Sequence, residues 1–419
     1  MTGGKLKVKT LLKWMFLLCC ILNYQLFYFL RLPNELLRYN SANNKTLITL
    51  IIIGMFGIML IIKRADCTSK WLSRYFFFFF ADVIAVYVYS VAKYRISLYS
   101  VFSVSYFYFI LLLAPSLVYI FEREKGFEKT LDTVMYVTLA AMILLAIQSF
   151  LYNTAGVVFL DGYFQVSSGI MRSGFLRMSI TPLGPFISIY AGYRAMSSQK
   201  HRWRYAMIAL FGIYCAAFVS RTRMLIIITV VCNLIMYLMC MKKQTKTNKI
   251  CICFAIAVIV VSMLPQLNTF FNTFSVDNVE SGSNTSIRLE AIAYYMGYIL
   301  KCPLTGQGFI NAANSTELYV LLRGLGGHFY YDDIGMIGTA SRFGVPGFVF
   351  QLLLLSFFWK TQNAIGDKKE RIFLIGLMSY YLLSMISLSM FDTQRIFVLA
   401  ITLAVFDYLN TLCKIEKEG

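Results

Sequence analysis

Residues 72–91 read LSRYFFFFFADVIAVYVYSV, and stretches of this kind decide the fold of the chain. This stretch contains only two charged side chains, Arg74 and Asp82. A helix needs about 20 predominantly apolar residues to cross the hydrocarbon core of a bilayer. The strands of a transmembrane barrel instead alternate apolar and polar residues over about ten residues. The stretch therefore predicts a membrane-spanning helix.

The composition extends this prediction to the whole chain. Of its 419 residues, 58% are hydrophobic and 14% are charged, and the mean hydropathy is +0.66. Soluble domains contain about 45–50% apolar and about 25% charged residues. These values exclude a soluble globular protein, a disordered chain and a fibrous repeat. We expect an all-α polytopic helical membrane protein that forms a single integral-membrane domain over residues 1–419.

Similar apolar stretches predict about twelve transmembrane helices. With the N-terminus in the cytoplasm, most of the 39 Lys and Arg residues fall in short cytoplasmic connections, as the positive-inside rule requires, and both termini are cytoplasmic. This topology and attraction to anionic membrane lipids explain the net charge of +19, so no nucleic-acid partner is predicted. The predicted helices cover residues 11–30, 47–62, 72–91, 101–120, 133–151, 178–196, 205–219, 224–241, 250–264, 340–359, 372–390 and 396–412.

Two connections on the outer side are much longer than the others, residues 152–177 and 265–338. Connections of this length are uncommon unless they carry their own structure and a function. We expect the longer one to form a large structured extracytoplasmic loop.

The sequence of this loop predicts two helices. Apolar residues recur at helical spacing over 287–300, where Ser286 is a suitable N-cap. Ser315 is a suitable N-cap for a second helix that runs to about Leu325, because Gly326 and Gly327 follow.

His328 is the only histidine expected on the outer side, and Asp332 follows it by one helical turn. Imidazole is the side chain best matched to proton transfer near neutral pH, so His328 and Asp332 are candidate catalytic residues. The alternative is a solvated loop histidine. Asp332 and Asp333 together are a weak candidate for a divalent metal.

Several arginines lie in or beside the two long connections, where lysine is scarce. A guanidinium group offers a fork of donors suited to phosphate, so these arginines are candidates for binding a diphosphate. The alternative is that they are interfacial side chains that reach toward the lipid headgroups. The candidates are Arg172, Arg177, Arg221, Arg223 and Arg288.

The chain resembles the Wzy-type polysaccharide polymerases and the related O-antigen ligases. The resemblance rests on the number of spans, the large outer loop in the C-terminal half and four loose motifs. These motifs are Ser220-Arg221-Thr222-Arg223, Arg288-Leu289-Glu290-Ala291 followed by Cys302-Pro303-Leu304-Thr305-Gly306-Gln307-Gly308, His328 with Asp332, and Gly344-Val345-Pro346-Gly347.

The resemblance implies a GT-C-like fold and a metal-independent, cofactor-free glycosyl transfer on the outer face of the bacterial inner (cytoplasmic) membrane. The implied donor is an oligosaccharide on undecaprenyl pyrophosphate, and the implied partners are membrane lipids, a chain-length regulator and a flippase. By similarity, Arg221 and Arg288, with Arg223 and Arg172 beside them, hold the pyrophosphate, and His328 takes the proton of the acceptor hydroxyl.

Three functions are open at this point. A polymerase extends O-antigen or capsular polysaccharide with lipid-linked repeat units, whereas a ligase transfers the chain to lipid A–core. A polysaccharide flippase or secondary transporter would use polar residues at the midplane of the membrane, where Asp82 is expected. Essential Arg and His residues on the outer side would indicate an enzyme, and an essential Asp82 would indicate a carrier.

Overall fold

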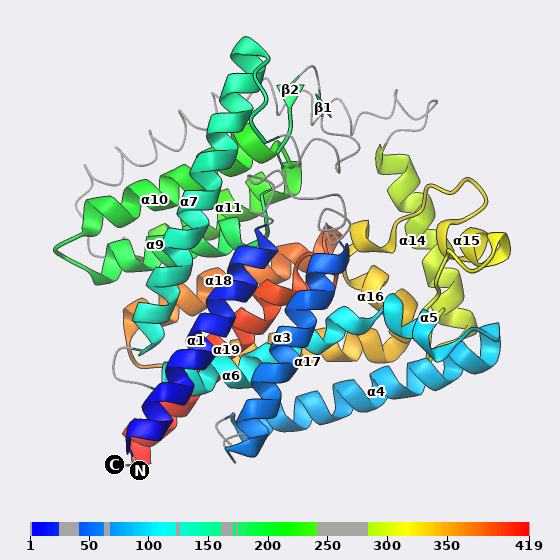
Figure 1. Cartoon of the computed structure of the whole chain (residues 1–419), viewed down its shortest axis with the longest axis horizontal. Coiled ribbons are helices and arrows are strands. Elements are labelled where there is room, and N and C mark those ends of the chain that lie inside the picture. The colour runs from blue at the N-terminus through cyan, green and yellow to red at the C-terminus, as the bar shows by residue number, and fades with distance from the viewer. Residues whose placement is uncertain are drawn as a thin grey trace.

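The computed structural model describes residues 2–24, 42–62, 68–122, 126–160, 171–172, 175–178, 180–240 and 284–418, and these ranges are almost entirely helical (Figure 1). Two short strands, β1 (Met171–Arg172) and β2 (Phe175–Leu176), form an antiparallel pair in which Arg172 lies opposite Phe175. The predicted all-α membrane class is thus confirmed within these ranges.

Within the described ranges, four segments are long and apolar enough to cross a membrane: α4 (Lys70–Tyr94), α7 (Gly126–Ala155), α10 with η4 (Arg202–Ser220) and α19 over Ile396–Ile415. Shorter apolar segments cover Lys45–Ile61, Tyr106–Phe121 and Met224–Cys240. The number of twelve spans therefore stays a prediction. The span predicted over 250–264 and part of the one over 11–30 lie outside the described residues.

The other described helices, together with the parts of the segments named above, complete the fold. Their bounds are α1 (Thr2–Asn23), α3 (Ala42–Ile61), α5 (Leu98–Ser103), η3 (Tyr106–Leu112), α6 (Leu113–Phe121), α9 (Leu183–Ser197), α10 (Arg202–Tyr214), η4 (Cys215–Ser220), α11 (Arg223–Cys240), α14 (Asn284–Lys301), α15 (Thr316–Arg323), η7 (Tyr331–Asp333), α16 (Gly335–Phe343), α17 (Val345–Ala364), α18 (Lys368–Ser387) and α19 (Ile396–Glu418).

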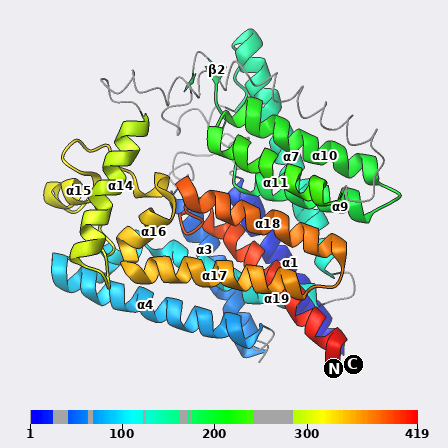
Figure 2. The same ribbon diagram turned by 180° about the vertical axis from the view of Figure 1, so that it is seen from behind.

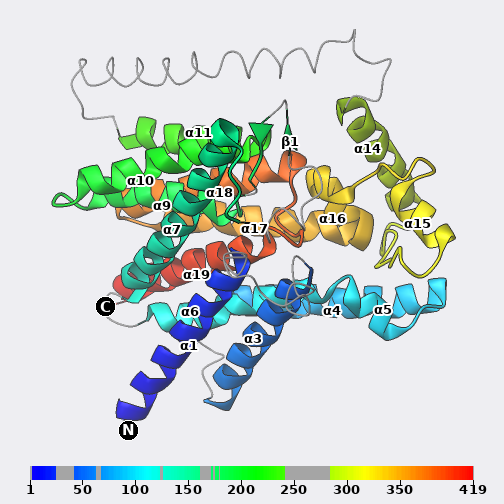
Figure 3. The same cartoon turned by 45° about the horizontal axis from the view of Figure 1, so that its top comes forward.

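The core lies around α19, which packs against α6, η3 and α17, while α18 packs against α9, α11 and α17 (Figure 2). All residues from 395 to 407 are buried. A helix that is apolar on all sides lies either in a protein core or in lipid, and the burial of these residues places this part of α19 in the core. Helices α1 and α3 lie side by side at the edge of this core (Figure 3).

A helix break at Gly344 corrects the span predicted over 340–359. Gly344 has a φ of 68°, and a Cβ there would overlap the carbonyl oxygen of Pro303. The close approach lets the Val345 amide donate to the Pro303 carbonyl at 2.7 Å. The region therefore forms two helices, α16 and α17, instead of one.

The segment 302–309 is fixed between this break and the end of α4. The buried Gln307 donates its backbone amide to the Ser341 carbonyl at 2.6 Å and its side-chain amide to the Leu321 carbonyl at 3.0 Å. The amide of Phe309 donates to Ser90 Oγ at 2.8 Å. The middle of the long loop is thus anchored to α4 and α16.

The predicted loop helices are present, with shifted ends. Ser315 caps α15 as expected, because its hydroxyl accepts from the Leu318 amide at 3.1 Å. The helix ends at Gly324, earlier than predicted, since this glycine has a φ of 73°. Helix α14 starts at Asn284, so Ser286 lies inside the helix and is not its N-cap. Residues 265–283 of the predicted loop lie outside the described residues.

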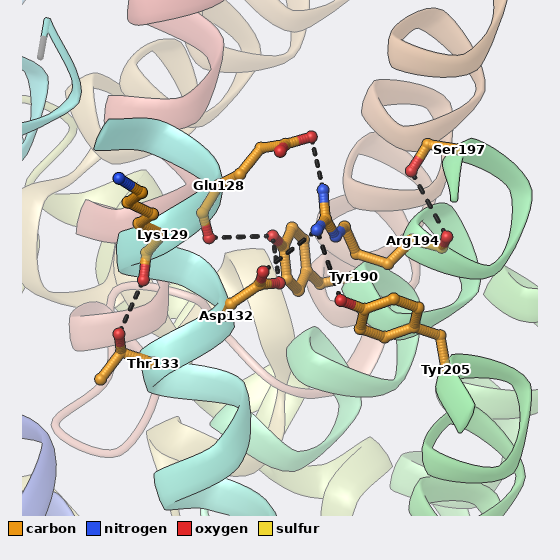
Figure 4. A network of polar contacts seen from close by, with 8 residues as sticks. All are labelled: Glu128, Lys129, Asp132, Thr133, Tyr190, Arg194, Ser197 and Tyr205. Carbon is orange, nitrogen blue, oxygen red and sulfur yellow. Dashed lines mark hydrogen bonds and ion pairs between the residues drawn. The ribbon is translucent and has the colours of Figure 1, made fainter. Parts of the chain in front are cut away.

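A charged network ties α7, α9 and α10 together on the predicted cytoplasmic side (Figure 4). Arg194 forms ion pairs with Glu128 and with Asp132, the latter at 3.1 Å, and donates to the Tyr205 hydroxyl at 3.3 Å. Tyr190 donates its hydroxyl to Asp132 at 2.9 Å. Both termini lie at the end of the molecule opposite to α14 and α15 (Figures 1 and 2).

Candidate functional site

The predicted arginine motif lies where η4 meets α11. The segment η4 is π-helical, and Arg221 directly after it has a φ of 49°. A non-glycine residue in the left-handed region is uncommon, and π-helical segments often occur at functional sites. The Arg221 guanidinium lies 4.0 Å from the centre of the Phe175 ring, and its Nε donates to the Phe218 carbonyl at 3.2 Å.

The strand pair brings the second connection onto this motif. Arg177 donates from Nε to the Ser220 carbonyl at 3.2 Å and from Nη2 to Thr222 Oγ1 at 3.0 Å. Arg172 pairs in register with Phe175, whose ring lies against Arg221. The strand pair thus lies beside the arginine motif, and a diphosphate site shared by these arginines stays a prediction. The side chains of Arg172 and Arg223 lie outside what the structure describes.

Arg288 belongs to a different group of elements. It lies exposed on α14, which packs against α16 and η7, whereas Arg221 precedes α11, which packs against α9 and α18. The two arginines therefore lie on elements that belong to different packing groups, and their joint action on one diphosphate stays a prediction.

His328 is exposed on a short turn after α15. The turn is closed by the Phe329 amide, which donates to the Arg323 carbonyl at 3.0 Å. Arg323 also donates from Nη1 to the Phe329 carbonyl at 3.4 Å. Buried Tyr295 of α14 donates to the Leu322 carbonyl at 2.6 Å, so the turn is anchored from below.

Asp332 lies half-buried in η7, among positively charged side chains of elements that are far apart in sequence. Burial raises the pKa of Asp332 above its usual value, while the guanidinium groups of Arg342, Arg395 and Arg323 oppose this shift. Asp332 and His328 therefore have different surroundings, although they are close in sequence.

The arginines around Asp332 are themselves held firmly. Arg342 is buried, lies 3.8 Å from the centre of the Tyr331 ring and donates to the Tyr108 hydroxyl at 3.3 Å. Arg395 is buried and forms an ion pair with Asp392.

We call Asp332, Asp333, Asp392, Arg323, Arg342, Arg395 and Lys45 the charged cluster. Lys45 belongs to it because it donates to the carbonyl of Thr393, between Asp392 and Arg395. The cluster joins the long loop to α3, α16 and the turn before α19.

Sequence reasoning missed most of this cluster. Arg342 fell inside a predicted span, and Arg395 fell between two spans. An arginine inside an apolar stretch requires a partner. The position of Arg342 in such a stretch could therefore have predicted a buried polar contact. Across the described ranges, no third metal-ligating side chain joins Asp332 and Asp333.

Residues 205–352 match the family model described as O-antigen ligase. The matched segment runs from α10 into α17 and contains Arg221, Arg223, Arg288, His328 and Asp332. No curated protein matches the chain. The resemblance inferred from the sequence is confirmed for this segment, which agrees with the superfamily of Wzy polymerases and O-antigen ligases and with a glycosyltransferase-like membrane enzyme.

Proposed function

We propose that this chain, which carries an O-antigen ligase domain over residues 205–352, polymerises undecaprenyl-pyrophosphate-linked oligosaccharide repeat units into O-antigen or capsular polysaccharide. The reaction takes place on the outer face of the cytoplasmic membrane. The observation that carries this proposal is the position of the family match, which contains the arginine motif at η4, the helices of the long loop and the His328 turn.

In this proposal Arg221 and Arg223, with Arg172 beside them, hold the pyrophosphate. The bond between the anomeric carbon of the donor and the pyrophosphate oxygen breaks, and its electron pair stays on that oxygen. Fixed guanidinium groups stabilise the charge that develops there. The contacts of Arg177 with Ser220 and Thr222 support this role, because they hold the backbone that carries the motif. Arg288 approaches the same pyrophosphate from α14.

The acceptor hydroxyl forms the new bond to the anomeric carbon and gives its proton to the His328 imidazole. A base must lie within hydrogen-bond reach of that proton, and the exposure of His328 on an anchored turn allows this. Asp332 serves as an acidic residue that keeps η7 and the turn in place through the charged cluster. The proposed reaction uses no metal and no cofactor.

The ligase remains the second candidate, because the matching family model bears that description. The transporter is the third. It is supported by Asp82 on α4, whose Oδ2 atom is buried and makes no hydrogen bond to any described residue. The three candidates differ in the residues and the acceptor that they require.

The test is a gel of surface polysaccharide from a deletion strain that carries the wild-type gene, Arg288→Ala or His328→Ala. We expect a ladder with the wild type and a single repeat on lipid A–core with either variant. Lys301→Ala is the matched control, because Lys301 is an exposed cation at the other end of α14. Loss of every attached repeat, with polymer still on the lipid carrier, would indicate the ligase. Intact ladders from both variants, together with loss in Asp82→Asn, would indicate the transporter.

A further inference from the structure

The exposed surface around His328 carries aromatic and charged side chains that a general base does not need. Tyr330 is 50% exposed and Tyr319 is 44% exposed, and both flank the turn that carries His328. The guanidinium of Arg323 lies 4.1 Å from the centre of the Tyr330 ring. Two aromatic rings, a cation and an imidazole thus share one small exposed area.

The turn holds these side chains in fixed positions. Gly324 and Gly327 have φ values of 73° and 70°, which favour glycine. A Cβ on Gly327 would lie 3.0 Å from the Tyr319 hydroxyl, so the Tyr319 ring lies directly beside the turn. On the inner side, the Phe329 ring packs against Tyr294 of α14, with ring centres 5.1 Å apart.

Both polar and apolar residues surround the two tyrosines, and Leu325 in the same turn is 95% exposed. The residues from Ala313 to Glu317, which lead into α15, are all exposed and read ANSTE. A tyrosine ring has an apolar body and a polar hydroxyl, so it can contact both the apolar and the polar parts of a ligand. The rings are therefore available to a ligand that has both hydroxyl groups and an apolar face.

We propose that Tyr319 and Tyr330 form a saccharide-binding platform that holds the acceptor sugar against His328. The inference rests on the proposed function, because a base for the acceptor hydroxyl must lie where the acceptor sugar binds. The C–H face of a pyranose stacks on the tyrosine rings, and Arg323 donates to a sugar hydroxyl. His328 then faces the hydroxyl that attacks.

The test uses the full chain in lipid nanodiscs. The donor is the lipid-linked repeat unit extracted from the deletion strain. The acceptor probe is the free repeat oligosaccharide, released by mild acid and labelled at its reducing end. The probe has no pyrophosphate and can therefore act only as an acceptor. The rate of probe elongation is measured against probe concentration for each variant.

We expect Tyr330→Ala to raise the KM for the probe about tenfold, a factor that corresponds to about 1.4 kcal/mol, with kcat within twofold of wild type. Tyr319→Ala is expected to raise the KM in the same direction. Tyr330→Phe keeps the ring and is expected to behave as wild type. Tyr99→Ala is the matched control, because Tyr99 is 81% exposed on α5 and belongs to neither the turn nor the charged cluster.

Three results overturn the platform alone. The first is an unchanged KM in both alanine variants while the wild type makes polymer. The second is an equal rise of KM in Tyr99→Ala. The third is a fall of kcat without a change in KM in both alanine variants, because that result assigns the tyrosines to support of the turn. A wild-type protein that elongates neither the probe nor the lipid-linked unit overturns the proposed function and the platform with it.

Discussion

Replacing Arg342 by methionine tests whether charge holds the long loop to the helical core. Methionine has a similar length but offers no donor to Tyr108 and no cation over the Tyr331 ring. A hydrogen bond from a charged group contributes about 1.5–3 kcal/mol, and a desolvated cation–π contact contributes about 2 kcal/mol. Removing one partner of a buried charged set costs about 3–5 kcal/mol. We expect a loss of this size in the free energy of unfolding.

The loss should depend on pH through Asp332. Burial raises the pKa of Asp332 above its value in the unfolded chain. The stabilisation from protonated Asp332 is therefore complete below the unfolded-state pKa, and it is lost as the pH rises through the folded-state pKa. Arg342 opposes the rise, so the pKa of Asp332 increases further in Arg342→Met. The variant should therefore be closer to wild type at pH 4 than at pH 8.

The assay is denaturant unfolding of the purified protein in detergent micelles at the two pH values. Arg371→Met, at an exposed arginine on α18, is the control for the loss of one charge. The double variant Asp332→Asn with Arg342→Met should lose less than the sum of the two single losses, because the two side chains act on each other. Equal losses at both pH values together with additive single variants would refute the electrostatic account.

Three other changes have defined outcomes. Gly344→Ala should lower the free energy of unfolding by about 1–3 kcal/mol, because the residue has a positive φ and a Cβ would overlap the Pro303 carbonyl. Gly366→Ala, where a Cβ meets no atom within 4 Å, should leave the free energy of unfolding near that of wild type. Arg221→Lys should reduce polymer on the gel without lowering the amount of protein in the membrane, because lysine lacks the guanidinium fork. A full ladder from this variant would contradict a forked contact between Arg221 and the phosphate. Ser315→Ala should lower the free energy of unfolding by about 1 kcal/mol through loss of the N-cap, and hydrogen exchange should become faster at the first amides of α15. Unchanged protection of these amides would show that the cap contributes little.

The features that could be predicted from sequence depend on local patterns. The long apolar stretches around Phe79 and Leu399 indicated α4 and α19, because the length and apolarity of a helix are written in consecutive residues. Ser315 was predicted as a cap for the same reason, since the hydroxyl and the amide that donates to it lie three residues apart. The arginine motif was found because Arg221 and Arg223 interrupt an apolar region.

The features that escaped prediction depend on residues far apart in sequence. The break at Gly344 exists because Pro303 lies against it, and no residue next to Gly344 in the sequence indicates this contact. Arg342 was assigned to a membrane span because its partners, Tyr108 and Tyr331, lie far from it in the sequence or outside its helix and are identified only by the three-dimensional contacts.

The anchoring of residues 302–309 also limits how this chain can be recombined with its relatives. A chimaera that exchanged only the loop would separate Gln307 from Ser341 and Phe309 from Ser90, and it would place foreign side chains against the backbone at Gly344. A functional exchange of substrate specificity therefore has to transplant the end of α4 and the junction of α16 with α17 together with the loop, as one inherited unit.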